Sequence, residues 1–254
     1  MKNKKSLLIP YITAGFPSKK LLIPILKTLS ENGADFIEIG VPHSDPLADG
    51  PVIQKSSKVA LENGVTLKWI VAALRATSLQ MEKLKPLILF SYLNPILQYG
   101  IKNLLKDLPK PLFYGLIIPD LPLEEAQKYL PLFKKYKLNL ILLAAPTTKK
   151  EKIKKIVAAY RGMPGGFIYL VSVTGTTGVR KNLSPELKTK IKEIKSVANI
   201  PVVVGFGISD SKQASQILSY GADGVVVGSA LIKVLKESNA SLKRLANFIK
   251  SFKC

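Results

Sequence analysis

Short apolar, β-rich runs alternate with helical segments eight times along the 254 residues of this chain. Several of these runs are continuously apolar, which is typical of parallel strands covered on both faces. The alternation predicts a (β/α)₈ TIM barrel that forms a single domain over residues 1–254. The expected strands are Leu7–Ile12, Phe36–Ile39, Leu87–Phe90, Gly115–Ile118, Leu138–Leu143, Phe167–Val171, Pro201–Val204 and Gly224–Val227.

Residues typical of helix ends support this alternation. Thr66 is expected to cap a helix that begins at Leu67, and Gly33 stands where a helix ends just before a strand. A doubly wound open sheet is the alternative architecture, but the G-x-G-x-x-G pattern typical of its first turn is absent after the first expected strand. The barrel is therefore the preferred fold.

The charge of the chain is strongly positive, with 38 basic against 17 acidic residues and a formal net charge of +21. The lysines are scattered over segments that read as amphipathic helices, which favours solvated faces over a nucleic-acid footprint. No uninterrupted apolar run exceeds the six residues of Leu140–Ala145, far fewer than a bilayer span requires. We therefore expect no nucleic-acid or membrane partner. The single cysteine, Cys254, favours a cytoplasmic location.

One stretch reverses this charge. Residues 31–54 contain no lysine or arginine, yet they hold five acidic residues and the only histidine of the chain, His43. A local excess of negative charge in such a basic chain marks this stretch as the place to look for chemistry.

Glu38 is the first candidate catalytic residue. It lies one residue before the end of the second expected strand, and strand alternation places it on the face opposite Ile37 and Ile39. A carboxyl group inside a barrel is poorly solvated, so its pKa rises and it suits proton transfer. The alternative is a surface glutamate on a strand in another register.

The segment after Glu38, Gly40–Pro51, is rich in proline and glycine and is expected to form a long shaped loop. Asp49 can bring a second carboxylate above the strand, and two carboxyl groups in different surroundings can divide acid and base roles. A turn role remains open for Asp49 and is favoured for Asp45. His43, without partners for a metal site, is expected to shape the loop.

Three glycine-rich turns near the end of the chain predict an anion site. Gly205-Phe206-Gly207 follows the seventh strand, Gly228-Ser229 follows the eighth, and Thr174–Gly178 follows the sixth. Glycines let backbone N–H groups approach an anion, and a helix that starts near Ala230 adds a favourable dipole. Many barrels bind phosphate with the loops after strands seven and eight. The loops after strands 2 and 6 are both expected to be mobile.

These segments together resemble the tryptophan synthase α subunit, in the same order along nearly the whole chain. The loop that follows Glu38 is the most specific of them. The matching segments are Leu8–Pro17, Ile37–Pro42, Ser44–Gln54, Tyr92–Pro95, Pro119–Pro122, Thr174–Gly178, Gly205–Ile208 and Gly228-Ser229.

The resemblance implies a lyase that cleaves indole-3-glycerol phosphate into indole and glyceraldehyde 3-phosphate by a retro-aldol reaction. It makes Glu38 the acid and base of that reaction and Asp49 the acceptor of the indole N–H. No metal or organic cofactor is implied for this chain. The substrate-binding residues implied by position are Tyr169, Thr177, Gly178, Phe206, Gly207, Gly228 and Ser229.

The resemblance also implies a partner, a β subunit that carries pyridoxal phosphate in an αββα heterotetramer. Asp120 and the Asn94-Pro95 region resemble the face that docks there. Two alternatives remain open: a weakly active subunit that binds and regulates the β partner, and a different barrel enzyme acting on a phosphorylated substrate.

Overall fold

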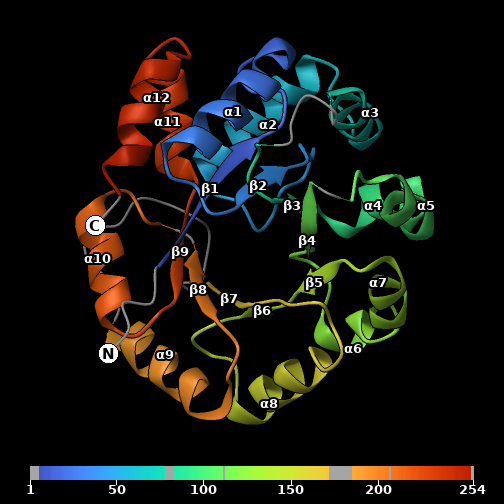
Figure 1. Ribbon diagram of the computed structural model, residues 1–254, viewed down its shortest axis with the longest axis vertical. Helices are drawn as coiled ribbons and strands as arrows, with labels where there is room; N and C mark the ends of the chain where they lie inside the picture. Colours follow the sequence, from blue (N-terminus) through green and yellow to red (C-terminus); the bar gives the residue numbers. More distant parts are fainter. Residues whose placement is uncertain (1–5, 78–82, 111, 172–184, 206, 253–254) are drawn as a thin grey trace.

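The strands form one parallel sheet that closes into a barrel in the computed structural model, which describes residues 6–77, 83–110, 112–171, 185–205 and 207–252 (Figure 1). Within these residues the strand order is β5-β4-β3-β2-β1-β9-β8-β7-β6. The TIM-barrel fold predicted from the alternation is confirmed. The strands are β1 (Leu7–Thr13), β2 (Ile37–Gly40), β3 (Leu87–Phe90), β4 (Phe113–Ile117), β5 (Asn139–Ile141), β6 (Leu143–Ala144), β7 (Ile168–Val171), β8 (Val202–Gly205) and β9 (Gly224–Val227).

Helices surround this barrel and connect successive strands (Figure 1). In the described residues they are the 3₁₀ turn η1 (Lys19–Leu21) and the α-helices α1 (Leu22–Asn32), α2 (Pro51–Glu62), α3 (Leu67–Thr77), α4 (Leu93–Tyr99), α5 (Ile101–Asp107), α6 (Leu123–Ala126), α7 (Leu130–Tyr136), α8 (Lys150–Ala159), α9 (Pro185–Val197), α10 (Ser211–Ser219), α11 (Ser229–Glu237) and α12 (Leu242–Lys250).

The fifth expected strand, Leu138–Leu143, is divided at Leu142, and in this respect the prediction of one continuous strand is wrong. The N–H of Leu142 donates to the hydroxyl of Tyr160 at 2.8 Å, and that hydroxyl donates to the carbonyl of Phe167 at 2.7 Å. The hydroxyl of Tyr160 thus replaces the main-chain carbonyl of a neighbouring strand as the acceptor for the N–H of Leu142. β5 pairs with β4 and β6 pairs with β7, so the two halves together fill one strand position and close the barrel.

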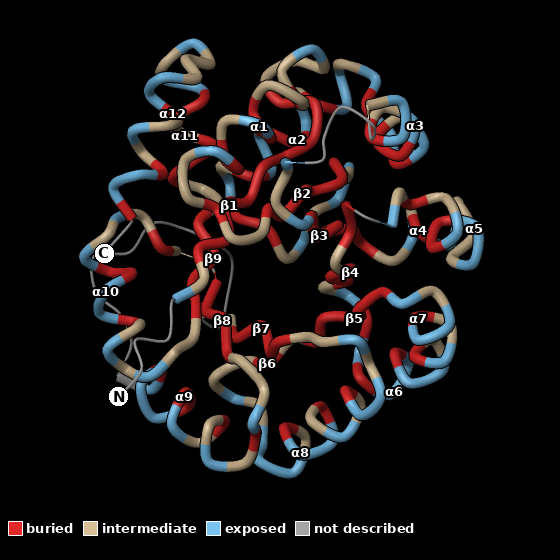
Figure 2. Tube along the Cα trace, viewed as in Figure 1, coloured by how far each residue is buried: buried red, intermediate tan, exposed pale blue. Residues whose placement is uncertain are grey.

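Burial follows the pattern expected of parallel strands. Every residue of β2, β3, β8 and β9 is buried, and the helices turn their buried sides toward the barrel and their exposed sides outward (Figure 2). The caps also agree with the sequence. Thr66 Oγ1 accepts from the N–H of Trp69, and Gly33 ends α1 with a φ of 126°. In the part of the chain that the structure describes, no helix is long and apolar enough to cross a membrane.

Candidate active site

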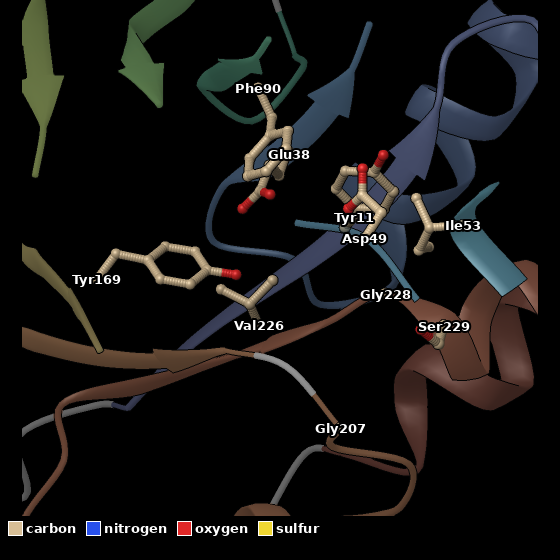
Figure 3. A pocket seen from close by; sticks show the side chains of 10 residues that line it. All are labelled: Tyr11, Glu38, Asp49, Ile53, Phe90, Tyr169, Gly207, Val226, Gly228 and Ser229. Atoms are coloured by element: carbon tan, nitrogen blue, oxygen red, sulfur yellow. The ribbon is translucent and has the colours of Figure 1, made fainter. Parts of the chain in front are cut away.

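Glu38 lies in the middle of β2, where its register partners are Tyr11 of β1 and Ile88 of β3. Its side chain is 1% exposed and lines a pocket at the end of the barrel where the strands terminate (Figure 3). The alternative of a surface glutamate is therefore wrong. Asp49 lines the same pocket from the loop between β2 and α2.

Burial controls the protonation of Glu38. Desolvation, and to a smaller extent the charge of Asp49, raise the pKa of its carboxyl group to about 8. Oε2 of Glu38 has no hydrogen-bond partner among the described residues. At neutral pH this carboxyl group therefore holds a proton and is free to meet a bound molecule.

Asp49 is buried as well, but its surroundings are more polar. Desolvation raises its pKa to about 6, while a hydrogen bond from Tyr92 acts in the opposite direction. Asp49 is therefore mostly ionised at neutral pH, where Glu38 is mostly protonated. Two carboxyl groups whose environments separate their pKa values are the usual arrangement for divided acid and base roles.

Hydrogen bonds hold the loop that carries Asp49. Its N–H donates to the carbonyl of Pro46 at 2.9 Å, and its own carbonyl accepts from Nε2 of Gln54 in the first turn of α2 at 2.9 Å. The ring of His43 stacks on Tyr92 with centroids 4.8 Å apart, which agrees with the expected loop-shaping role. Pro51 starts α2, because a proline is well suited to the first turn of a helix.

Two tyrosines form the other walls of the pocket, and both pack against glycines. A Cβ atom on Gly40 would lie 2.0 Å from the hydroxyl oxygen of Tyr11, and one on Gly205 would lie 2.1 Å from that of Tyr169. These two positions therefore require glycine. Tyr169 was expected from the sequence resemblance, whereas Tyr11 and Tyr92 were not identified as site residues. The available signal was their position near the carboxyl ends of strands, since Tyr11 lies two residues before the end of β1 and Tyr92 two residues after the end of β3.

The opposite rim of the pocket is suited to an anion. Gly207, with a φ of 81°, Gly228 and Ser229 line it, and Ser229 is the first residue of the nine-residue helix α11. A helix N-terminus offers backbone N–H groups and a positive dipole end. The structure thus brings Gly207, Gly228 and Ser229 to the pocket of Glu38 and Asp49, as Figure 3 shows.

Three of the expected substrate-binding residues, Thr177, Gly178 and Phe206, lie outside the described residues. The glycine-rich turn 174–178 lies outside them too. The mobility expected for the loops after strands 2 and 6 stays a prediction. Across the described ranges, no three His, Cys, Asp or Glu side chains are grouped so that they could hold a metal ion.

A closed barrel that presents a protonated and an ionised carboxyl group opposite a helix N-terminus defines a class of enzyme that performs acid–base chemistry on small phosphorylated substrates. The family described as "Tryptophan synthase alpha chain" matches residues 1–253. This chain belongs to the tryptophan synthase alpha chain family, as the sequence resemblance predicted.

Individual relatives agree over nearly the whole length. The tryptophan synthase alpha chain of Prochlorococcus marinus subsp. pastoris is 44% identical over 251 residues, covering 99% of this chain and 87% of the relative. That of Arabidopsis thaliana is 42% identical over 252 residues, covering 98% and 90%.

Solved structures give the same result. Mycobacterium tuberculosis tryptophan synthase has a chain with a TM-score of 0.86 and 37% identity, covering 98% of this chain and 92% of its own. The tryptophan synthase complex of Pyrococcus furiosus has one with a TM-score of 0.86 and 32% identity, covering 98% of each. Family membership gives this chain the function of an α subunit in tryptophan biosynthesis, with the lyase activity that cleaves indole-3-glycerol phosphate.

Proposed function

We propose that Glu38 and Asp49 divide the proton chemistry of this cleavage, and that Gly207, Gly228 and Ser229 hold the phosphate of the substrate. The observation that carries the proposal is that one pocket joins the two carboxyl groups to the N-terminus of α11. The indole ring then lies toward the carboxyl groups and the glycerol phosphate tail toward the helix.

Glu38 transfers protons at both ends of the bond that breaks. Its carboxyl group is protonated at neutral pH, so it gives a proton to C3 of the indole ring. The carboxylate that forms takes the proton of the hydroxyl group on the adjoining side-chain carbon. The C–C bond then breaks, its electron pair returns to the ring, and indole and the aldehyde leave with Glu38 protonated again.

Asp49 stabilises the positive charge that appears on the ring when C3 is protonated. Its ionised carboxylate accepts a hydrogen bond from the indole N–H, and the interaction strengthens as the ring becomes cationic. Burial supports this role, because a charge pair is worth more in a poorly solvated site than in water.

Among the described residues, backbone donors are the groups that hold the phosphate. The first turn of α11 and the glycine turns offer N–H groups at the rim. Tyr169 lines the wall between the two ends of the pocket. The family resemblance adds Phe206 beside the ring, and Thr177 and Gly178 in the loop that follows the sixth strand.

Neither proton transfer requires a metal ion or an organic cofactor. We propose that the chain works without one and that pyridoxal phosphate belongs to the β partner. We propose that the chain acts in the cytoplasm, which agrees with its single cysteine.

The described surface offers a face for that partner. Its exposed large apolar side chains are Leu47 (75%), Leu97 (50%) and Leu61 (37%), which come from the loop after β2, from α4 and from α2. Asp120 accepts from the N–H of Leu93 at 2.9 Å and so fixes the start of α4. A groove links these elements, lined by Val41, Pro42, Leu61, Val65, Thr66, Leu67, Lys68, Pro95, Gln98 and Tyr99. We propose that the β subunit docks on this face in an αββα complex.

An indole-release assay with indole-3-glycerol phosphate, run with and without a β subunit, tests the proposal. Indole is expected from the isolated chain, with faster release when the partner is added. Release only in the presence of the partner would favour the regulatory alternative, and no release in either arm would contradict the proposed roles.

The docking face is tested separately by Leu97→Asp. This change is expected to prevent co-purification with the β subunit while cleavage by the isolated chain continues. The matched control is Ser219→Asp, at an exposed position on α10. Normal complex formation by Leu97→Asp would contradict the proposed face.

A further inference from the structure

Two buried hydroxyl groups join the end of β1 to α2. Thr13, the last residue of β1, and Ser56, in the second turn of α2, are both 1% exposed, and their hydroxyl oxygens lie 2.6 Å apart. The hydroxyl of Ser56 also contacts the carbonyl of Ile53 at 2.8 Å.

The direction of these bonds follows from counting hydrogens, because each hydroxyl group carries only one. Ser56 donates its hydrogen to the carbonyl of Ile53, so Thr13 must donate in the contact with Ser56. This relay therefore runs in one direction, from Thr13 through Ser56 to the backbone of α2.

The first turn of α2 carries groups that matter to the pocket. The side chain of Ile53 lines it, and Gln54 donates to the carbonyl of Asp49 at 2.9 Å. The carboxylate of Asp49 is held from the opposite side by Tyr92. Asp49 is thus fixed twice, through its side chain by Tyr92 and through its main chain by α2.

We propose that Thr13 and Ser56 are positioning residues: their relay locks the first turn of α2 against β1 and so sets the place of Asp49. The proposal rests on the role of Asp49 given above. Its consequence is that two residues that do not line the pocket of Glu38 and Asp49 influence turnover.

Thr13→Val tests the relay, because it removes the hydroxyl group and nearly keeps the volume of the side chain. We expect kcat for indole release by the full chain to fall by about tenfold, since small displacements of a catalytic group are costly. KM is expected to change by less than about threefold, because the phosphate grip on α11 is untouched. Thr13→Ser, which restores the hydroxyl group, is expected to recover most of kcat.

The matched control is Thr28→Val. The hydroxyl of Thr28 donates to the carbonyl of Pro24 within α1, so this variant loses a similar hydrogen bond away from the pocket. Its kcat is expected to stay within about twofold of the original value. Thermal unfolding of all variants shows whether the chain is folded, and Ser56→Ala supplies a second break in the relay if Thr13→Val fails to fold.

Coupling separates positioning from a general loss of structure. With Asp49 already replaced by Asn, Thr13→Val is expected to cost less than about threefold, and Thr13→Val with Ser56→Ala to cost no more than either alone. Unchanged kcat in Thr13→Val and Ser56→Ala, or the same tenfold loss in the Asp49→Asn background, would overturn the proposal. If Asp49→Asn itself turned over normally, the role of Asp49 would fail, while the first two variants would still decide whether the relay affects turnover.

Discussion

The hydroxyl group of Tyr92 donates to Oδ2 of Asp49 at 3.1 Å and accepts from the N–H of Ala48 at 2.9 Å. One side chain, from the residue that precedes α4, therefore holds both the carboxylate and the backbone of the loop that carries it. The ring of His43 stacks against this tyrosine and completes the support. Because the bond from Tyr92 favours the ionised form of Asp49, it partly offsets the effect of burial on the pKa.

Removal of that bond by Tyr92→Phe is expected to raise the pKa of Asp49 further above about 6. Less Asp49 is then ionised near neutral pH, so the acid limb of the kcat/KM profile moves to higher pH, by about half to one unit. Tyr99→Phe, which removes a donor to Asp107 elsewhere in the chain, is the control. An acid limb that does not move in Tyr92→Phe would show that the bond does not tune Asp49.

Replacement of Glu38 is expected to change how stability depends on pH. The pKa of Glu38 is raised from 4.5 to about 8 by folding, so the folded chain keeps a proton that the unfolded chain releases. This contribution to stability is complete below about pH 4.5 and is lost as the pH rises to about 8. The variant Glu38→Gln has no titrating carboxyl group at this position, so its stability does not fall for this reason as the pH rises.

Denaturant unfolding at pH 5 and pH 8 measures the difference. The free energy of unfolding of Glu38→Gln, relative to the unmodified chain, is expected to be larger at pH 8 than at pH 5. Asp49, whose pKa is raised to about 6, is buried in both proteins, and its charge is the smaller cause of the shift at Glu38, so burial of Glu38 dominates the difference. An advantage of the variant that stayed constant with pH would mean that Glu38 is ionised normally in the folded chain.

Asp49→Asn keeps the shape of the side chain and removes its charge. We expect the transition state to lose about 2–4 kcal/mol of stabilisation, and kcat to fall by about one and a half to three orders of magnitude. Substrate affinity is expected to change much less, because the carboxylate interacts more weakly with the uncharged ring of the bound substrate than with the protonated ring of the transition state. A normal rate constant would leave Asp49 with a structural role only.

Ser229→Asp separates phosphate binding from folding. A carboxylate at the first residue of α11 interacts favourably with the helix dipole, so thermal stability is expected to stay the same or rise slightly. The same charge repels the substrate phosphate, so KM is expected to rise by at least about a hundredfold. Ser211→Asp, at the first residue of α10, is the control and is expected to leave KM unchanged. Unchanged KM in Ser229→Asp would place the phosphate elsewhere.

Most of the fold could be predicted from the sequence, because continuously apolar runs and helix caps are local signals. The division of the fifth strand could not, since it depends on Tyr160, a residue distant in sequence that inserts its hydroxyl group between Leu142 and Phe167. No local pattern at Leu138–Leu143 distinguishes a continuous strand from an interrupted one.

The site divides along the same lines. Glu38 could be predicted from the sequence, because strand alternation fixes the face on which it lies. Tyr11 and Tyr92 could not be predicted as site residues, because an aromatic residue near a strand end has the same local pattern whether it packs in the core or faces a ligand. The contact between Thr13 and Ser56 joins residues 43 positions apart, so only the folded barrel shows it.

The most direct test of the proton-transfer role is indole release from a single turnover of Glu38→Gln at neutral pH, measured beside the binding of indole-3-glycerol phosphate. The glutamine keeps the shape of the pocket but carries no transferable carboxyl proton. We predict that binding is retained within a few fold while release slows by about two to four orders of magnitude. Release at the rate of the unmodified chain would contradict the assignment of both proton transfers to Glu38.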